Sequence, residues 1–156
     1  MKKIDENYEF AVFLKAHADD EELDKQFKSL HDKYFKNYNC EKCRKCCKKL
    51  HATFKENEID KASKQLKIEK EDFIKIYLKS KDNNTYSTKR IPCPFLKNNK
   101  CILEENKPKD CKEYPFTNKK ERLFSLYSIM DNTLICPVVN NIIEELKEIY
   151  HFKVKS

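Results

Sequence analysis

Four of the eight cysteines in this 156-residue chain fall within one short stretch. They follow the pattern C-x-x-C-x-x-C-C and are Cys40, Cys43, Cys46 and Cys47. A C-x-x-C step lets two sulfurs converge on one metal ion, because a tight turn or a single helical turn brings them together. If the stretch is helical, at about 100° per residue, the four sulfurs fall on an arc of roughly 120°. Thiolates at such range repel one another, and a bound cation removes that repulsion.

The other four cysteines lie downstream and are Cys93, Cys101, Cys111 and Cys136. Three of the four touch a proline or lie within four residues of one. Proline fixes the backbone and prevents a helix from continuing, so these cysteines are expected on rigid turns. We therefore expect all eight cysteines to act as metal ligands and the two groups to meet in space.

Two other interpretations of the cysteines stay open. An even count permits a disulfide framework, although no secretory signal is visible and Cys46 and Cys47 are adjacent. Some cysteines can also serve as small buried apolar residues, and Cys136 between Ile135 and Pro137 is the first candidate. His51 could add a ligand on the face of Cys47, but a lone histidine is more often a surface or core residue.

The order, spacing and flanking residues of the cysteines resemble the C-x-x-C-x-x-C-C family, a zinc- or iron-chelating domain related to the cysteine domain of flagellin lysine N-methylases. The resemblance covers about residues 40–137. It rests on the first four cysteines, Cys93-Pro94-Phe95-Leu96, Cys101-Ile102, Lys107-Pro108, Cys111, Tyr114-Pro115-Phe116 and Cys136-Pro137. The chain departs from the family at Arg44, where glycine is usual, and at Lys107, where arginine is usual. Neither departure removes a sulfur.

The identity of the metal is the next question. Four thiolates hold a tetrahedral zinc ion or a [4Fe–4S] cluster equally well. The compact C-x-x-C-x-x-C run is typical of ferredoxin cluster loops, which also place a proline near a further cysteine. The related methylases are associated with an iron–sulfur centre. We therefore expect an iron–sulfur cluster, of the [4Fe–4S] type, with zinc as the alternative.

The composition limits what else the chain can do. It contains no glycine, which excludes glycine-rich nucleotide loops and the nucleophile elbow. Backbone positions with positive φ must then be filled by other residues, and we expect Asn83, Asn84, Asn98, Asn99 and Asn118 to fill them. The formal charge of +7 comes from 33 basic residues, of which only three are arginine, so nucleic-acid binding is not favoured. Lys42, Arg44, Lys45, Lys48 and Lys49 surround the first cysteines and are expected to lower their pKa values.

No secretory h-region and no apolar run near 18 residues is visible, so we expect a cytoplasmic protein with no membrane span and reduced cysteines. A metal ion or cluster is the expected partner, with a protein partner as a further expectation.

The elements that would position the cysteines follow from periodicity. We expect a short helix or strand over 7–17, a helix over about 19–37, and a helix pair over about 56–66 and from 67 to about 78. Further expectations are a strand at 85–88, a hairpin turn at 97–100, a strand at 122–130 and a helix over about 137–152. The helix pair is expected to form a wall over the metal site.

These elements predict a mainly α, small single domain (1–156) with irregular cysteine-rich loops and at most a short hairpin, organised around a metal centre. Within it we expect a helical extension at 1–38, a cysteine-cluster core at 39–137 and a C-terminal helix at 138–156. The expected function is metal binding. The resemblance implies one alternative, a protein-lysine N-methyltransferase-like enzyme. A second alternative is a metal-delivery or redox-sensing protein, which would need exposed sulfurs and fits the lysine-rich surround of the first cysteines. No residue is assigned a catalytic role.

Overall fold

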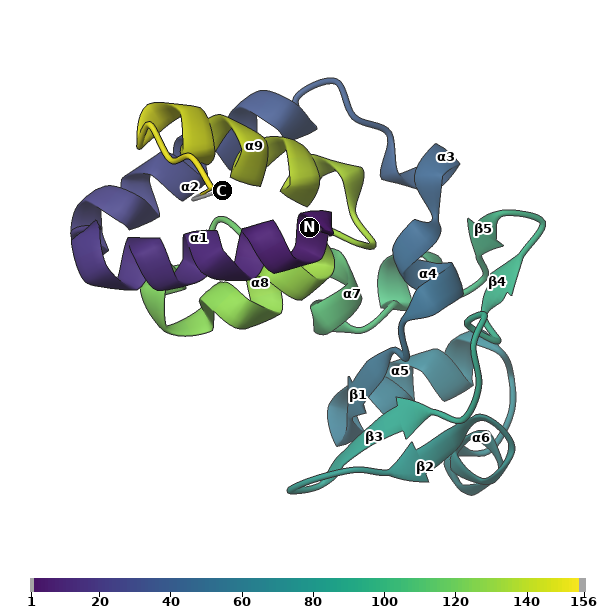
Figure 1. Ribbon diagram of the computed structural model, residues 1–156. Helices are drawn as coiled ribbons and strands as arrows, with labels where there is room; N and C mark the ends of the chain where they lie inside the picture. Colours follow the sequence, from purple (N-terminus) through teal and green to yellow (C-terminus); the bar gives the residue numbers. More distant parts are fainter. Residues whose placement is uncertain (1, 155–156) are drawn as a thin grey trace. The chain divides into compact units, whose positions relative to one another are not determined.

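The computed structural model describes residues 2–154, and the chain divides into two compact units. The helical unit comprises residues 1–39 and 115–156, and the cysteine unit comprises residues 40–114. Within the described residues the fold is mainly helical, with only short antiparallel strands, which confirms the expected mainly α fold class (Figure 1). Its organisation around a metal centre stays a prediction. The domain boundaries drawn from the sequence stay a prediction. None of the helices in the described residues is both long and apolar enough to span a bilayer.

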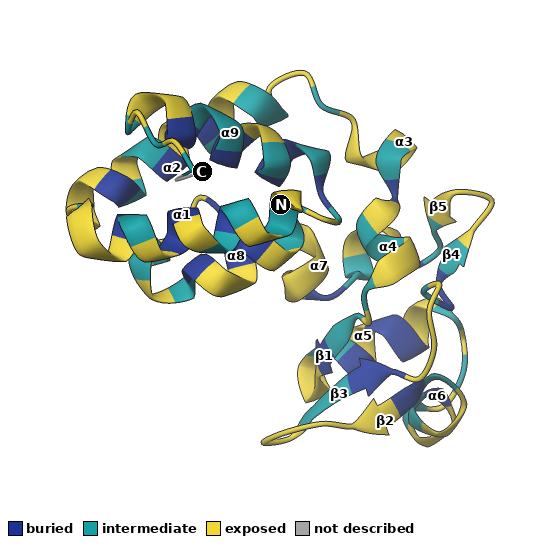
Figure 2. Ribbon diagram, viewed as in Figure 1, coloured by how far each residue is buried: buried dark blue, intermediate teal, exposed yellow. Residues whose placement is uncertain are grey.

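The helical unit is built from α1 (Lys3–His17), α2 (Asp20–Phe35), the 3-10 turn η2 (Arg122–Ser125), α8 (Leu126–Asn132) and α9 (Pro137–Ile149). The Asp19 side chain caps α2 by accepting the Glu22 N–H at 3.0 Å. Pro137 starts α9 at the first helical position, where its missing N–H costs nothing. Helix α2 packs on α9 and α1 packs on α8, with their buried faces turned inward (Figure 2).

The helices expected at 19–37 and 137–152 are confirmed, and residues 7–17 are helical. The strand expected at 122–130 is wrong, because this segment forms η2 and α8. Its buried residues are Leu126, Ile129 and Met130, which recur at helical spacing. The apolar residues of this segment therefore fit helical spacing as well as the weak alternation from which a strand was predicted.

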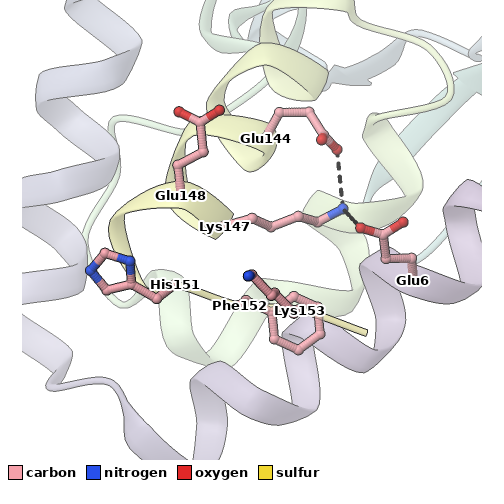
Figure 3. A pocket seen from close by; sticks show the side chains of 7 residues that line it. All are labelled: Glu6, Glu144, Lys147, Glu148, His151, Phe152 and Lys153. Atoms are coloured by element: carbon pink, nitrogen blue, oxygen red, sulfur yellow. Dashed lines mark hydrogen bonds and ion pairs between the residues drawn. The ribbon is translucent and has the colours of Figure 1, made fainter. Parts of the chain in front are cut away.

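A buried lysine joins two helices of the helical unit. Lys147 is only 5% exposed, and its ammonium donates to Glu6 Oε1 at 3.0 Å, to Asn7 Oδ1 at 2.7 Å and to Glu144 Oε1 at 3.0 Å. Figure 3 shows the ammonium between the carboxylates of Glu144 and Glu6 beside a cavity of about 440 Å³. All three of its protons are used, so Lys147 acts as a structural cation that joins α1 to α9.

Replacing Lys147 by alanine should destabilise the protein by about 1.5–3 kcal/mol. Charge-assisted hydrogen bonds are lost, and the buried Asn7 side-chain oxygen loses the ammonium donor. The cost should lie at the lower end of this range if water solvates the partly exposed carboxylates of Glu6 and Glu144 in the variant. Urea unfolding of Lys147→Ala against the matched control Lys153→Ala, an exposed lysine of the same segment, measures the effect. Equal stabilities of the two variants would contradict the structural role.

The cysteine unit contains a three-stranded antiparallel sheet in the order β1-β3-β2, with β1 at Thr53–Lys55, β3 at Thr85–Thr88 and β2 at Leu78–Ser80. Two helices, α5 (Glu56–Gln65) and α6 (Lys70–Tyr77), pack on each other. The remaining elements are α3 (Cys40–Cys43), α4 (Lys45–Lys49), the hairpin strands β4 (Leu96–Lys97) and β5 (Lys100–Cys101), η1 (Glu104–Asn106) and α7 (Lys109–Glu113). The expected helix pair, the strand at 85–88 and the turn at 97–100 are confirmed.

An aromatic core fills the cysteine unit and reaches the cysteines. Phe95 stacks on Phe73 with ring centroids 5.3 Å apart, and it meets Phe54 edge-on at 5.8 Å. The buried core residues are Phe54, Ile59, Ala62, Phe73, Leu78, Phe95 and Leu103. Cys93 and Cys101, on either side of Phe95 in the chain, pack against this core. The core therefore fixes the backbone that carries these two cysteines.

Non-glycine residues fill the positive-φ positions, as the composition requires. Asn83, Asn84, Asn98 and Asn99 adopt positive φ as expected. The expectation for Asn118 is wrong, because Phe116, with φ 65°, takes the left-handed conformation in that turn.

Truncating Phe95 to alanine should destabilise the metal-free protein by about 3–5 kcal/mol, the usual cost of emptying a buried phenylalanine site. Phe124 is 77% exposed, so Phe124→Ala is the matched control and should change stability by no more than about 0.5 kcal/mol. Denaturant unfolding measures both variants. A Phe95→Ala protein as stable as the control would show that the aromatic core does not support the cysteine unit.

Candidate metal centre

The first cysteine stretch is not one continuous helix. Helix α3 ends at Cys43, Arg44 turns the chain with φ 51°, and α4 begins at Lys45. The Arg44 N–H still donates to the Cys40 carbonyl at 3.0 Å, so the turn is tight. The arc expected for an unbroken helix does not apply, and the left-handed residue redirects the chain between Cys43 and Cys46.

A backbone hydrogen bond brings the downstream cysteines to the first stretch. The Cys93 N–H donates to the carbonyl of Cys47 at 2.7 Å. Leu96 N–H donates back to the Cys93 carbonyl at 3.0 Å, and Leu96 pairs with Cys101 across the hairpin β4–β5. Cys93, Cys101 and Cys47 therefore belong to one local arrangement, although they are far apart in the sequence.

Cys111 lies in the short helix α7 of the same unit, where its N–H donates to the Pro108 carbonyl at 3.0 Å. Burial of the thiol raises the pKa of Cys111 to about 12, although the residue as a whole is exposed, and the charges of Cys93, Cys47 and Cys101 raise it further. The Cys111 sulfur is therefore within electrostatic reach of these three sulfurs.

The thiols of the adjacent pair Cys46 and Cys47 affect each other's ionisation. Their interaction raises the pKa of Cys46 and lowers the pKa of Cys47. Arg44 and Lys107 lower the pKa of Cys47 as well. Within this pair, Cys47 therefore ionises at the lower pH.

Burial raises the pKa of the thiol at Cys93 to about 11 and also raises that of Cys40. Cys43 raises the pKa of Cys40 as well, whereas Lys107 and Arg44 lower it. Lys107, where the family usually has arginine, thus acts on both Cys40 and Cys47.

Positive charge is concentrated in the unit that carries these cysteines. Residues 40–114 contain 20 of the 33 basic residues and 12 of the 26 acidic ones, so this unit has a formal charge of +8 and the remaining residues −1. The excess offsets the charge that seven thiolates would bring.

The eighth cysteine belongs to the other unit. Cys136 is buried, 9% exposed, and is the N-cap residue of α9. Seven of the eight expected ligands thus share the cysteine unit, and Cys136 lies in the helical unit. The imidazole Nδ1 of His51 makes a hydrogen bond with the Thr88 carbonyl at 2.8 Å, so this nitrogen is occupied by the backbone.

All eight cysteines are present as thiols. Across residues 2–154, no three or more His, Cys, Asp or Glu side chains stand in position to hold a metal ion. The donor set nevertheless fits a thiophilic metal: the seven cysteines of this unit are half-buried or exposed, and Arg44 and Lys107 act on Cys47. The backbone brings Cys93 to Cys47.

Asn99 contributes to the site in a way that its sequence pattern did not indicate. Its carbonyl accepts the Arg44 Nε–H at 3.1 Å, and its side-chain Nδ2 donates to the Glu41 carbonyl at 3.2 Å. The sequence indicated only a positive-φ turn at this residue. The sequence signal that could have indicated this contact is Arg44, an arginine between two cysteines, which needs a hydrogen-bond acceptor nearby.

In the metal-free protein, Cys47 should be alkylated by iodoacetamide at lower pH than Cys93. The thiolate is the nucleophile, so a lowered pKa moves the rise in rate to lower pH and a raised pKa moves it higher. Initial rates across pH 5–10, measured at each cysteine by peptide mass spectrometry, test this. In denaturant the two profiles should coincide. Coincident profiles in the folded protein would contradict the electrostatic asymmetry.

Comparison with known proteins agrees with this geometry. A family model named for the CxxCxxCC pattern and described as "Putative zinc- or iron-chelating domain" matches residues 39–137. No curated protein and no solved structure matches the chain. The matched segment contains all eight cysteines and covers more than half of the chain. The protein therefore belongs to the CxxCxxCC family.

Proposed function

We propose that this protein binds an iron–sulfur cluster or zinc through its cysteines, with an iron–sulfur cluster preferred. The observation that carries the proposal is the backbone hydrogen bond from Cys93 to Cys47, which joins the two cysteine groups. The proposed ligands in the cysteine unit are Cys40, Cys43, Cys46, Cys47, Cys93, Cys101 and Cys111. Cys136 is the proposed eighth ligand.

The charges around the sulfurs support a bound cation. Burial raises the pKa values of Cys40, Cys93 and Cys111, and neighbouring thiols raise them further, so the metal-free arrangement resists ionisation of these thiols. A metal ion reverses this, because ligation stabilises the thiolate and releases the proton. Arg44 and Lys107 favour the same ionised state.

Two features favour iron–sulfur over zinc. The spacing Cys40, Cys43, Cys46 is that of ferredoxin cluster loops, with prolines beside Cys93 and Cys136. The downstream cysteines do not repeat a C-x-x-C pair, as two separate zinc ribbons would. We propose a [4Fe–4S] cluster, in a protein of the cytoplasm, where thiols stay reduced.

When bound, the cluster would supply one-electron chemistry. If it takes no part in electron transfer, it would stabilise the fold. The chain would supply the remaining parts of the site: the aromatic core holds Cys93 and Cys101, and the cations offset thiolate charge.

Metal delivery or redox sensing is the second candidate, because Cys40 is exposed. Exposed sulfurs permit exchange with an acceptor or an oxidant. The methyltransferase-like alternative stays a prediction of the family resemblance, and no contact described above favours it.

Protein purified without oxygen should contain iron and acid-labile sulfide and show the broad visible absorbance of thiolate-ligated clusters. Cys47→Ser, Cys93→Ser and Cys111→Ser should each lose most of the bound metal, whereas Lys97→Gln, an exposed change on the hairpin, should retain it. Cys136→Ser decides whether the eighth cysteine belongs to the ligand set. Colourless protein that contains stoichiometric zinc would show that the bound metal is zinc and not an iron–sulfur cluster.

Wild-type protein that takes up neither iron nor zinc would overturn the proposal. Transfer of the metal from the loaded protein to a metal-free acceptor, followed by the loss of absorbance, tests delivery. A centre that resists both chelators and acceptors would argue against delivery and leave metal binding intact.

A further inference from the structure

Arg44 is a buried cation in a backbone conformation that is unfavourable for any residue but glycine. It is 9% exposed and has φ 51°. A side chain with Cβ resists this conformation, and an arginine resists burial unless its charge is paired. Both features persist only if the surrounding contacts hold them in place.

Those contacts join the first cysteine stretch to the tip of the hairpin β4–β5. The Arg44 Nε–H donates to the Asn99 carbonyl at 3.1 Å, and the Asn99 amide donates to the Glu41 carbonyl at 3.2 Å. The two bonds run in opposite directions between the same two segments. Each segment thereby satisfies a polar group of the other.

The same guanidinium acts on the Cys47 sulfur. The charge of Arg44 lowers the pKa of Cys47, and the carbonyl of Cys47 accepts the Cys93 N–H at 2.7 Å. The Cys93–Leu103 segment is therefore held at its start by Cys47 and at its tip by Arg44. Cys101 lies on β5, directly after that tip.

We propose that Arg44 is a positioning residue that holds Cys93 and Cys101 opposite Cys47 before the metal binds, and that its charge offsets the thiolates afterwards. The second part rests on the proposed function, whereas the first part concerns the metal-free protein alone. Lysine cannot reproduce this role, because a single ammonium lacks the planar, fixed donors with which the guanidinium meets the Asn99 carbonyl.

Amide hydrogen exchange of the metal-free protein tests the first part. Arg44→Gln should speed exchange at the Cys93 and Ile102 amides by about tenfold, as expected for one or two lost hydrogen bonds. The Ile102 N–H donates to the Phe95 carbonyl at 2.8 Å and so reports on the hairpin. Lys97→Gln, an exposed change of equal charge on the same hairpin, should leave both rates at the wild-type value.

Chelator competition with zinc as the probe metal tests the second part. Arg44→Gln should weaken zinc binding about 10- to 100-fold, the usual loss on removing a partner of a metal ligand. Arg44→Lys should exchange as fast as Arg44→Gln but bind zinc more tightly, because it retains the charge. Arg44→Gly relieves the backbone and removes the contacts, so it should match Arg44→Gln.

Asn99→Gly tests the same contact between the two segments if the Arg44 variants do not fold. Glycine accepts the φ of 62° at this position and removes only the bond to Glu41. It should speed exchange at Ile102 by a smaller factor. If both Arg44→Gln and Asn99→Gly match Lys97→Gln in exchange and in zinc affinity, the proposal is overturned while metal binding stands. If wild-type protein binds no metal, the proposed function fails, and the exchange rates still decide whether Arg44 holds the hairpin.

Discussion

A single backbone hydrogen bond, from the Cys93 N–H to the Cys47 carbonyl, fixes how the two groups of cysteines meet. It joins two segments whose thiols resist ionisation, because burial and the neighbouring sulfurs raise the pKa values of Cys93 and Cys111. The rest of the cysteine unit serves that constraint. The aromatic core holds the backbone around Phe95, and Arg44 and Lys107 place positive charge at the sulfurs. A bound metal cation would offset the remaining negative charge of the thiolates, which Arg44 and Lys107 offset only in part.

The absence of glycine shapes the site as strongly as the presence of cysteine. Among residues 2–154, ten non-glycine residues adopt positive φ, and four of them are the asparagines of two Asn-Asn turns. Two members of this set, Arg44 and Asn99, contact each other beside the cysteines. Where glycine would give a flexible turn, arginine gives a turn that also carries a charge and a set of donors. The chain thus combines turn, contact and charge in one residue.

Local patterns predicted the local structure. Apolar periodicity predicted the helices at Asp20–Phe35 and Pro137–Ile149, and the Asn-Asn pair predicted the hairpin turn. The segment 122–130 was predicted wrongly, because apolar residues that alternate weakly also satisfy helical spacing, and packing decided between the two. Non-local features could not be predicted: the meeting of Cys47 with Cys93, the contact of Arg44 with Asn99 and the division into two units depend on the folded chain.

The central claim is that sulfur atoms from both cysteine groups surround one metal centre. X-ray absorption at the iron and zinc edges, on protein purified without oxygen, tests it most directly. The account predicts a first shell of sulfur alone, at about 2.3 Å, for whichever metal is bound, and loss of that shell in Cys93→Ser. A first shell of nitrogen or oxygen, or a sulfur shell unchanged in Cys93→Ser, would contradict it.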